Sequence, residues 1–350
     1  MKEQEKKQRE ESLTDLGEFG LIRRIEESVQ LRNESSIVGI GDDAAVIDPK
    51  GKKMVVTTDI LLEGIHFDLT YCPLRHLGYK AVVVNLSDIY AMNARPKQIV
   101  VAIGVSNKFT LKAIDEIYDG MLMACERYGV DLVGGDTTTS MTGLTLSITA
   151  IGEAEEEKLT YRSGAKINDI VCVSGNLGAA YMGLQLLERE KRVLRGDNDG
   201  RPAFDGYDYI LERQLKPEPR YDVIDFLDKI GVVPTSMIDI SDGLSSEMLH
   251  ICNRSKVGCR IYEEKIPIDH VTRNMAEEIN FNPVVAALNG GEDYELLFTI
   301  SQDDYSKFQS APGPDIFAIG YITDEQKGYR LITTGGDEAD LVAQGWKAFS

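Results

Sequence analysis

The sequence "SMIDISDGLSSEMLHICNRSKVGCRIYEE", residues Ser236–Glu264, contains the pattern on which the fold assignment depends. An apolar run ends at Asp239, a glycine-containing acidic turn follows, and a helical segment leads to a second apolar run. Apolar residues recur at helical spacing in the middle of the stretch: Leu244, Met248, Ile251 and Cys252. This periodicity is typical of a helix with one buried face. The stretch therefore predicts strand, acidic turn, helix and strand.

Segments of strand and helix character also alternate before this stretch. "KMVVTTDI" (53–60) predicts a buried strand that ends in polar residues, and "LTLSITAIG" (144–152) predicts a strand with period-two alternation. "VDLVGGDTT" (130–138) predicts a strand that breaks into a glycine turn. Some strands follow one another without a helix. Both an α/β and an α+β fold class are therefore expected alternatives.

Two long helices are predicted in the first half of the chain. "LRHLGYKAVVVNLSDIYAMN" (74–93) carries Leu77, Ala81 and Val84 at helical spacing. "TLKAIDEIYDGMLMACERYG" (110–129) begins with a plausible N-cap, Thr110, and ends at a glycine, Gly129. The apolar stripe of this second helix comprises Ile114, Ile117, Met121 and Cys125.

The length of 350 residues exceeds one average core and predicts two domains. A charged, turn-rich segment, "GEAEEEKLTYRSGAKIND" (152–169), indicates the boundary. We expect a flexible arm at 1–15, an N-terminal domain at 16–155 and a C-terminal domain at 156–350. The arm, "MKEQEKKQREE", has no apolar segment behind it and is not expected to be a signal peptide.

The formal net charge of -19 argues against nucleic acid or an anionic membrane as a partner, because both are polyanions. No apolar run approaches the roughly 20 residues of a membrane span. The chain has five cysteines and no CxxC: Cys72, Cys125, Cys172, Cys252 and Cys259. We interpret them as reduced core thiols of a cytoplasmic protein.

Acidic residues recur where predicted strands end: Asp42, Asp43, Asp59, Asp136, Asp239 and Asp242. Asp88 lies within an otherwise apolar helix, and these segments offer no matching basic residues. Because unpaired buried carboxylates are costly, divalent cations with oxygen ligands are the expected compensation. The alternative for any single Asp is a turn former or a helix cap, and Asp242 could cap the helix that begins at Gly243.

Several common nucleotide and metal motifs are absent from the sequence. There is no GxxxxGK[ST] phosphate loop, no GxGxxG that opens a helix and no HExxH, and "DNDG" (197–200) lacks the remaining spacing of a calcium loop. The glycines of "GIG", "GGD", "SGNLG" and "NGG" permit close backbone approach or anion binding, with ordinary turns as the alternative.

Eight motifs in fixed order identify a resemblance. They are "GIGDDAAV" (39–46), "TTDILLEGIHF" (57–67), "YKAVVVNLSD" (79–88), "AMNARP" (91–96), "GGDTT" (134–138), "LTYRSGAK" (159–166), "IDISDGL" (238–244) and "GGEDYEL" (290–296). Each is weak alone. Together they resemble the thiamine-monophosphate kinase family, within the superfamily of aminoimidazole ribonucleotide synthetase, from about Gly17 to Phe349.

The resemblance implies a two-domain aminoimidazole ribonucleotide synthetase-like fold. It implies an ATP-binding N-terminal domain that also forms a homodimer, and a C-terminal α/β domain. The implied reaction transfers the γ-phosphoryl group of ATP to thiamine monophosphate, and several Mg²⁺ ions are the implied cofactors. The implied Mg²⁺ ligands are Asp43, Thr57, Thr58, Asp59, Asp88, Asp136, Asp239 and Asp242. The implied nucleotide contacts are Tyr118, Gly135, Asp136, Arg162 and Ser241, and the implied acceptor contacts are His66, Glu292 and Trp346.

Plain structural roles compete with several of these assignments. His66 could be a structural histidine, Arg162 a solvated loop cation, Glu292 a turn carboxylate and Trp346 a core cap. The functional alternatives are a phosphate clamp for Arg162, contact with a cationic head for Glu292 and aromatic stacking for Trp346.

The chain departs from the family pattern at two positions of the helix-end motif. Tyr90 and Asn93 stand where the family usually has a small residue and a glycine, which concerns the local backbone geometry. Thr57 stands where Ser is common, and either hydroxyl can ligate a metal.

The acceptor phosphate is itself ionised near neutral pH, so the reaction needs no general base. We therefore expect direct in-line transfer without a catalytic side chain. Rival readings are a sister enzyme of the superfamily and a non-catalytic Mg-nucleotide-binding regulator. Aminoimidazole ribonucleotide synthetase is one such sister enzyme, and "GIHF", "RSGAK" and "GGEDYEL" fit it less well. A selenophosphate synthetase should carry a reactive Cys or selenocysteine and Lys near the N-terminus, and a hydrogenase maturation protein needs a C-terminal cysteine. This chain has neither feature.

Overall fold

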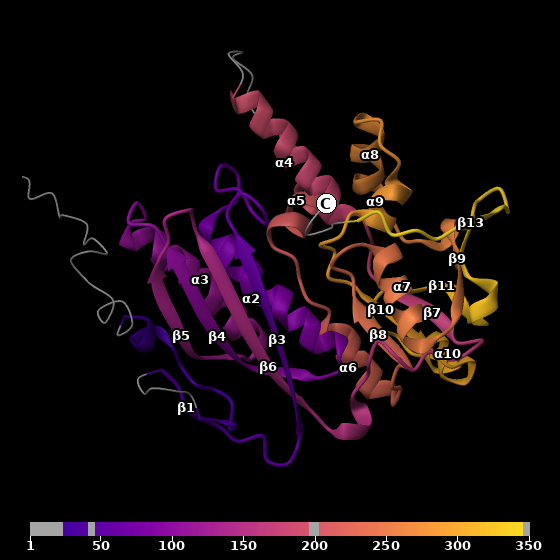
Figure 1. Cartoon of the computed structure of the whole chain (residues 1–350), viewed down its shortest axis with the longest axis horizontal. Coiled ribbons are helices and arrows are strands. Elements are labelled where there is room, and N and C mark those ends of the chain that lie inside the picture. Colours follow the sequence, from indigo (N-terminus) through magenta and orange to yellow (C-terminus); the bar gives the residue numbers. More distant parts are fainter. Residues whose placement is uncertain (1–23, 41–45, 196–202, 346–350) are drawn as a thin grey trace, which may run out of the picture. The chain divides into compact units, whose positions relative to one another are not determined.

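The structure, a computed structural model, describes residues 24–40, 46–195 and 203–345 (Figure 1). The chain forms two compact units. The first contains the described residues up to 50 together with 58–82 and 97–150, and the second contains 51–57, 83–96 and the described residues from 151 onward. The domain boundaries expected from the sequence stay a prediction.

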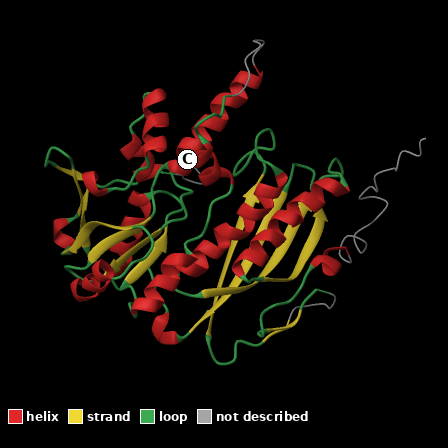
Figure 2. Ribbon diagram, turned by 180° about the vertical axis from the view of Figure 1, so that it is seen from behind, coloured by secondary structure: helices red, strands yellow, loops and turns green. Residues whose placement is uncertain are grey.

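A four-stranded sheet with the order β3-β6-β4-β5 is built from the first half of the chain. Its strands are β3 (Lys53–Leu62), β4 (Arg95–Val105), β5 (Asp131–Thr139) and β6 (Thr145–Ala154). Strands β4 and β5 pair in parallel. A separate antiparallel pair joins β1 (Ser36–Val38) to β2 (Val46–Ile47). Figure 2 shows helices on one face of the four-stranded sheet, and Figure 1 identifies them as α2 (Leu74–Ala91) and α3 (Leu111–Tyr128).

The local signals for helix α3 are confirmed. Thr110 is the N-cap, and its side chain accepts a hydrogen bond from the Ala113 amide. Gly129 ends the helix in the left-handed conformation, with φ of 65°. The predicted stripe of Ile114, Ile117, Met121 and Cys125 is buried. Capping and periodicity act within one or two turns, which is why the sequence alone predicts this helix.

Strand β3 is not the buried strand that the sequence predicts. Its alternate residues Val56 and Ile60 are 63% and 52% exposed. Successive side chains of a strand point to opposite faces, so covering one face of the sheet buries only every second residue. The apolar residues on the other face are open to solvent in the single chain.

The glycine turn predicted in "VDLVGGDTT" is also wrong, because β5 continues through Gly134 and Gly135 to Thr139. The pairing with β4 shifts register between Ile99 and Val100, as in a bulge. A Cβ atom on Gly135 would lie 2.1 Å from the Val101 carbonyl oxygen. The glycine therefore permits close approach of two strands rather than a turn.

The second unit contains a mixed seven-stranded sheet with the order β13-β12-β9-β11-β7-β10-β8. Strand β12 pairs in parallel with β9, and the other pairs of this sheet are antiparallel. The strands are β7 (Ile170–Ser174), β8 (Ser236–Asp239), β9 (Gly258–Tyr262), β10 (Leu296–Ile300), β11 (Ile316–Thr323), β12 (Tyr329–Ile332) and β13 (Glu338–Asp340). This mixture of parallel and antiparallel pairing confirms the predicted α/β (α+β) fold class.

The helices of the second unit follow the same chain order. They are α4 (Ala179–Arg195), α5 (Asp208–Leu215), α6 (Tyr221–Ile230), α7 (Leu244–Ser255), α8 (His270–Glu278), α9 (Pro283–Asn289) and α10 (Gln302–Ser310). Single 3-10 turns lie at η1 (Glu156–Lys158), η2 (Glu263–Lys265) and η3 (Glu325–Lys327). One core lies between the sheet and α7, and a second joins α4, α5, α8 and α9.

The opening stretch folds as predicted, with β8, an acidic turn, α7 and β9 in succession. The four apolar residues of its helical stripe are all fully buried. All five cysteines are buried and free of disulfides. Within the described ranges, no helix has the length and apolar character needed to cross a bilayer.

Helices α2 and α3 pack through a reciprocal pair of glycines. A Cβ atom on Gly78 would lie 1.9 Å from the Ile117 carbonyl oxygen, and one on Gly120 would lie 1.9 Å from the Arg75 carbonyl oxygen. A glycine inside a helix costs about 0.5–1 kcal/mol relative to alanine. Close helix packing is the gain that offsets this cost.

We expect Gly120→Ala to destabilise the protein although alanine is the better helix former. The added methyl group has to push the two helices apart, and such overpacking costs about 1–3 kcal/mol. Urea denaturation would measure the change, with Lys112→Ala on the exposed side of α3 as the control. A Gly120→Ala variant as stable as the parent would show that the helices separate freely.

Candidate active site

Three predicted site residues of the second unit, Thr57, Asp88 and Asp239, meet at helix α2. Thr57, on β3, donates a hydrogen bond of 2.6 Å from its Oγ1 to Oδ2 of Asp88. The neighbouring residue Ser87 donates a bond of 2.6 Å to Oδ2 of Asp239, at the end of β8. Two consecutive residues of α2 thus connect to two different strands, to the middle of β3 and to the end of β8. Ser87 was not among the predicted site residues.

Both acids of this cluster are withdrawn from water. Asp239 is 3% exposed and Asp88 is half-buried. Burial raises the pKa of the Asp88 carboxyl, while the Thr57 hydrogen bond and the positive charge of Arg162 oppose that shift. The hydroxyl donors therefore favour the ionised carboxylates, which are the form that a cation binds.

The acidic turn between β8 and α7 excludes the alternative that Asp242 is the helix cap. The N-cap of α7 is Gly243, with φ of 116° and no side-chain capping bond, so Asp242 does not cap the helix. The Asp242 amide instead donates a 3.1 Å bond to Oε1 of Glu247. Burial raises the pKa of Asp242, and the charges of His250 and Arg162 oppose the shift. The Asp242 side chain is left for a role outside the helix.

Glu247 is a second residue that the sequence analysis missed. It is buried in the first turn of α7, and burial raises the pKa of its carboxyl to about 8. Its Oε2 atom is buried without a hydrogen-bond partner among the described residues. A glutamate shortly after an acidic turn was the available signal, because acids are common in first turns.

Arg162 supplies positive charge that the acidic segments themselves lack. Burial raises the pKa of both Asp88 and Asp242, and the charge of Arg162 opposes that rise. The same charge lowers the pKa of His250, where burial is the larger cause. The sequence offered no basic partner within the acidic segments, and the structure provides one from a separate loop.

The loop that carries Glu292 lies beside the acidic turn. The Glu292 amide donates a 2.7 Å bond to the Ser241 carbonyl, and the Tyr294 amide donates a 2.9 Å bond to the Ile240 carbonyl. A Cβ atom on Gly291 would lie 2.4 Å from the Ser241 oxygen. The glycine before Glu292 therefore permits this close backbone approach.

The first unit contains the remaining described candidates. Thr58 donates to the Ile148 carbonyl, so its hydroxyl is engaged on the face of β3 opposite to Thr57. Nδ1 of His66 accepts a 3.0 Å bond from the Leu62 amide, which fixes the ring orientation. Gly135 and Asp136 are exposed on β5, and Tyr118 is buried in α3.

Asp43 and Trp346 lie outside the described residues. Among the residues that the structure describes, no group of three or more His, Cys, Asp and Glu side chains has the arrangement of a metal site. The donors at the predicted positions are nevertheless all oxygen atoms, the type that Mg²⁺ prefers. Their chemistry thus fits the implied cation.

Of the two departures from the family pattern, Asn93 is accommodated by its backbone conformation. Asn93 has φ of 54°, and asparagine is one of the few residues besides glycine that adopts this conformation readily. Its Nδ2 donates a 2.8 Å bond to the Lys158 carbonyl. Tyr90 is buried, and burial raises the pKa of its hydroxyl.

Comparison with known proteins finds relatives that share one activity in their names. The family profile "AIR synthase related protein, N-terminal domain" matches residues 41–154. The chain is 33% identical to a thiamine-monophosphate kinase of Aquifex aeolicus, covering 96% of this chain and 99% of the relative. It is 34% identical to that of Bacillus subtilis, covering 95% and 100%. The chain belongs to the thiamine-monophosphate kinase family. This confirms the resemblance and the prediction that the chain is an enzyme of this class.

Solved structures support the family fold. AaThiL complexed with AMPPCP and TMP superposes with a TM-score of 0.73 at 32% identity, covering 96% of this chain and 98% of that chain. A hydrogenase maturation protein in complex with ATP reaches a TM-score of 0.71 at 18% identity, over 92% and 94%. The second likeness concerns the fold alone. Sequence relationship places the chain with the thiamine-monophosphate kinases.

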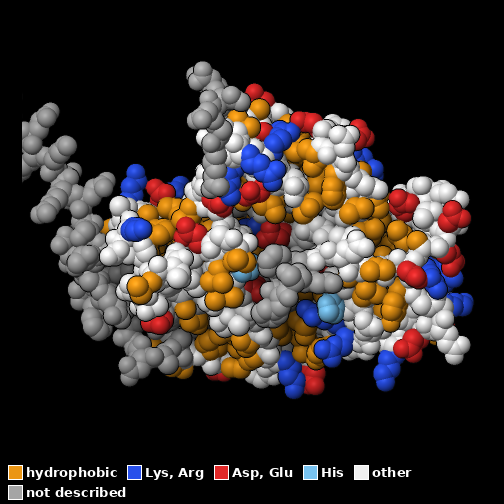
Figure 3. Space-filling model, turned by 45° about the horizontal axis from the view of Figure 1, so that its top comes forward, with side chains coloured by type: hydrophobic (Ala, Val, Ile, Leu, Met, Phe, Trp, Pro, Cys, Tyr) orange, Lys and Arg blue, Asp and Glu red, His pale blue; other side chains and the backbone are white. Residues whose placement is uncertain are grey.

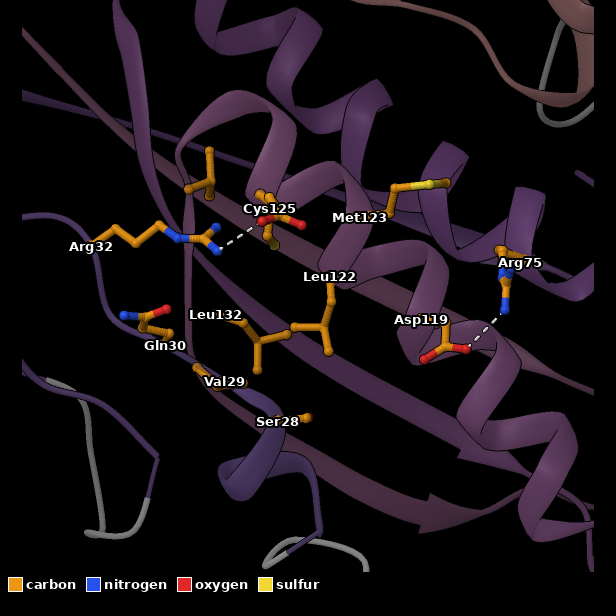
Figure 4. Close-up of a pocket in the computed structure, with 12 residues that line it drawn as sticks. Ser28, Val29, Gln30, Arg32, Arg75, Asp119, Leu122, Met123, Cys125 and Leu132 are labelled. Carbon is orange, nitrogen blue, oxygen red and sulfur yellow. Dashed lines mark hydrogen bonds and ion pairs between the residues drawn. The ribbon is translucent and has the colours of Figure 1, made fainter.

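A pocket of about 380 Å³ lies in the first unit of this family member, away from its predicted ligand residues (Figure 4). It lies between α3 and the segment around Ser28. Arg32 pairs with Glu126, and Arg75 pairs with Asp119, at its edge. None of the predicted site residues lines it.

We expect Ser87→Ala to lower the free energy of unfolding of this kinase-family protein by about 1–3 kcal/mol. The change removes a hydrogen-bond donor from the buried Asp239 carboxylate. Equilibrium urea denaturation measures the effect, and Ser246→Ala on α7 is a control of the same chemistry. Equal stability of Ser87→Ala and the parent would mean that the Ser87–Asp239 bond contributes nothing to folding.

Proposed function

We propose that the chain phosphorylates thiamine monophosphate to thiamine diphosphate with ATP, by direct in-line transfer assisted by several Mg²⁺ ions. The observation that carries the proposal is the gathering of Asp88, Asp239 and Asp242 around the α2 end and Arg162, in a chain of this family. The complex of the related AaThiL with AMPPCP and TMP supports the same pair of substrates.

We assign the cation ligands to the oxygen-bearing residues of the acidic motifs. They are Asp43, Thr57, Thr58, Asp59, Asp88, Asp136, Asp239 and Asp242. Asp88 and Asp239 each accept a hydrogen bond from a hydroxyl group. Thr58 is the weakest member of the set by geometry, since its hydroxyl already bonds to the Ile148 carbonyl. Bound Mg²⁺ would neutralise negative charge between the carboxylates and the phosphates.

The nucleotide contacts that we propose are Tyr118, Gly135, Asp136, Arg162 and Ser241. Arg162 is exposed, and its planar fork suits two phosphate oxygens at once. Gly135 and Asp136 are exposed on the same strand. Tyr118 is only 7% exposed, so its contact would be limited to the edge of the ring.

The acceptor contacts that we propose are His66, Glu292 and Trp346. Glu292 brings negative charge toward the cationic head of thiamine, and an aromatic ring such as that of Trp346 suits a flat cation. The His66 ring is held through Nδ1 by the Leu62 amide, so a contact would use Nε2.

The chemistry needs position and charge rather than a nucleophilic side chain. Two unit charges 4 Å apart interact by about 4 kcal/mol at an effective dielectric of about 20, so two phosphates repel strongly. The acceptor phosphate is largely ionised near neutral pH and needs no base to remove a proton. We assign to Arg162 the role of holding positive charge beside the transferred group.

The proposed assembly is a homodimer formed through the N-terminal domain. The exposed apolar residues Met54, Val56 and Ile60 of β3 form a surface that a second copy could cover. We also propose a cytoplasmic location, supported by the free buried cysteines. On the face in Figure 3, Lys and Arg side chains are interspersed with Asp and Glu, which does not favour nucleic acid.

The protein incubated with ATP, Mg²⁺ and thiamine monophosphate should form thiamine diphosphate, and Asp59→Asn should abolish turnover. The variant removes one charge from the proposed cation site, so it should stay folded by thermal melting. Asp115→Asn, in an exposed ion pair with Arg24, is the matched control and should keep its activity. Normal turnover by Asp59→Asn would remove that residue from the site. Absence of turnover in the parent, with ATP binding retained, would favour a regulator.

Direct transfer predicts that no phospho-enzyme accumulates. The site carboxylates are assigned to cation binding, which leaves no assigned nucleophile. Protein treated with γ-labelled ATP and Mg²⁺, without the acceptor, should carry no stable label after denaturation. Stoichiometric label that moves into thiamine diphosphate when the acceptor is added would overturn direct transfer.

A further inference from the structure

The loop of the "GGEDYEL" motif has an unusual backbone. Glu292 and Tyr294 adopt φ of 57° and 52°, a left-handed conformation that glycine occupies more readily. Such conformations persist only where surrounding contacts hold them, and they occur often at ligand sites. Here the amides of both residues bond to the backbone of the acidic turn. These bonds therefore hold the loop in a single conformation, although its backbone is strained.

Glu295 of this loop is fully used by the fold. It is buried, and its Oε1 lies 2.9 Å from Nη2 of Arg213 on α5. Its Oε2 accepts bonds of 2.6 Å from Arg220 and from Ser174. Arg213 also donates a 2.8 Å bond to the Asp293 carbonyl. These bonds attach helix α5 firmly to the loop.

Asp293 is also used by the fold. Its side chain is fully buried, and Oδ2 accepts a 2.7 Å bond from the Gly178 amide just before α4. Burial raises the pKa of Asp293 to about 7, and Arg213 and the Gly178 amide oppose the shift. Of the three acids in the motif, Glu292 alone is partly exposed.

Gln214, on helix α5, forms a hydrogen bond with Glu292. It follows Arg213 on α5, is 5% exposed, and donates a 2.9 Å bond from Nε2 to Oε2 of Glu292. An amide orients a carboxylate without cancelling its charge. An arginine or lysine at this place would form an ion pair and compete with a cationic ligand for Glu292.

We propose that Gln214 is a positioning residue that fixes the Glu292 carboxylate for the cationic ring of the acceptor. The proposal rests on the proposed role of Glu292 in acceptor binding. Arg213, through Glu295, holds α5 so that the Gln214 amide meets Glu292. The Gln214–Glu292 bond then sets affinity for the acceptor and leaves the ATP site unaffected.

The test compares Gln214→Leu with the parent in steady-state kinetics. The variant removes the amide donor with little change of volume, and KM for thiamine monophosphate should rise about tenfold, since the lost bond is to a charged group. The kcat and the KM for ATP should stay within about twofold. Glu212→Ala, on the exposed side of α5, is the control and should match the parent. Gln214→Met is a second variant without the donor.

A double-mutant comparison separates positioning from general packing. In the Glu292→Gln background, Gln214→Leu should add little to the KM for thiamine monophosphate, because Glu292→Gln has already removed the negative charge that Gln214 positions. Fully additive effects would overturn the proposal. So would equal increases of both KM values, or failure of both Gln214 variants to fold.

The role of Glu292 is tested in the same experiment. If Glu292→Gln alone leaves the affinity for thiamine monophosphate unchanged, the assumed acceptor contact is wrong and the proposal falls with it. If Glu292→Gln weakens binding while Gln214→Leu does not, the acceptor contact stands and only the positioning role is overturned. Calorimetric titration of thiamine monophosphate without ATP gives both answers independently of turnover.

Discussion

A carboxylate that is taken out of water must receive hydrogen bonds or positive charge, and this requirement shapes the second unit. Thr57 and Ser87 supply hydroxyl donors to Asp88 and Asp239. Amides and arginines supply the donors for the acids of the 290–295 loop. The protein thereby distributes its acids into two groups. Asp293 and Glu295 pair with arginine and hold the fold, and Asp88 and Asp239, which we assign to cation binding, accept bonds from hydroxyls.

The first unit contains a buried acid that has the same requirement and a structural role. Asp131, at the start of β5, accepts bonds from the amides of Arg32 and Asn33 and from the Ser36 hydroxyl. These donors come from the start of β1 and the residues just before it, and they attach this segment to the sheet. An acid at a strand end is thus no sign of a ligand site by itself, and only its partners distinguish the two uses.

Local signals explain why much of the fold could be predicted. A cap such as Thr110, a stop such as Gly129 and an apolar stripe depend on neighbours within a few residues. The continuous strand through Gly134 and Gly135 depends on the distant Val101 carbonyl, so the glycines were read as a turn. In the site, the motif order identified the family. Ser87 and Gln214 escaped notice because their partners lie 152 and 78 residues away.

The alternation of side chains along β3 limits insertions and deletions within this strand. Thr57 faces Asp88, and Thr58 faces the neighbouring strand. A one-residue insertion or deletion inside the strand would exchange these faces and turn the hydroxyl away from Asp88. The loop before the strand, around Lys50 and Gly51, carries no such parity. Length changes in related sequences should therefore accumulate in that loop and be excluded from the strand, independently of which amino acids are substituted.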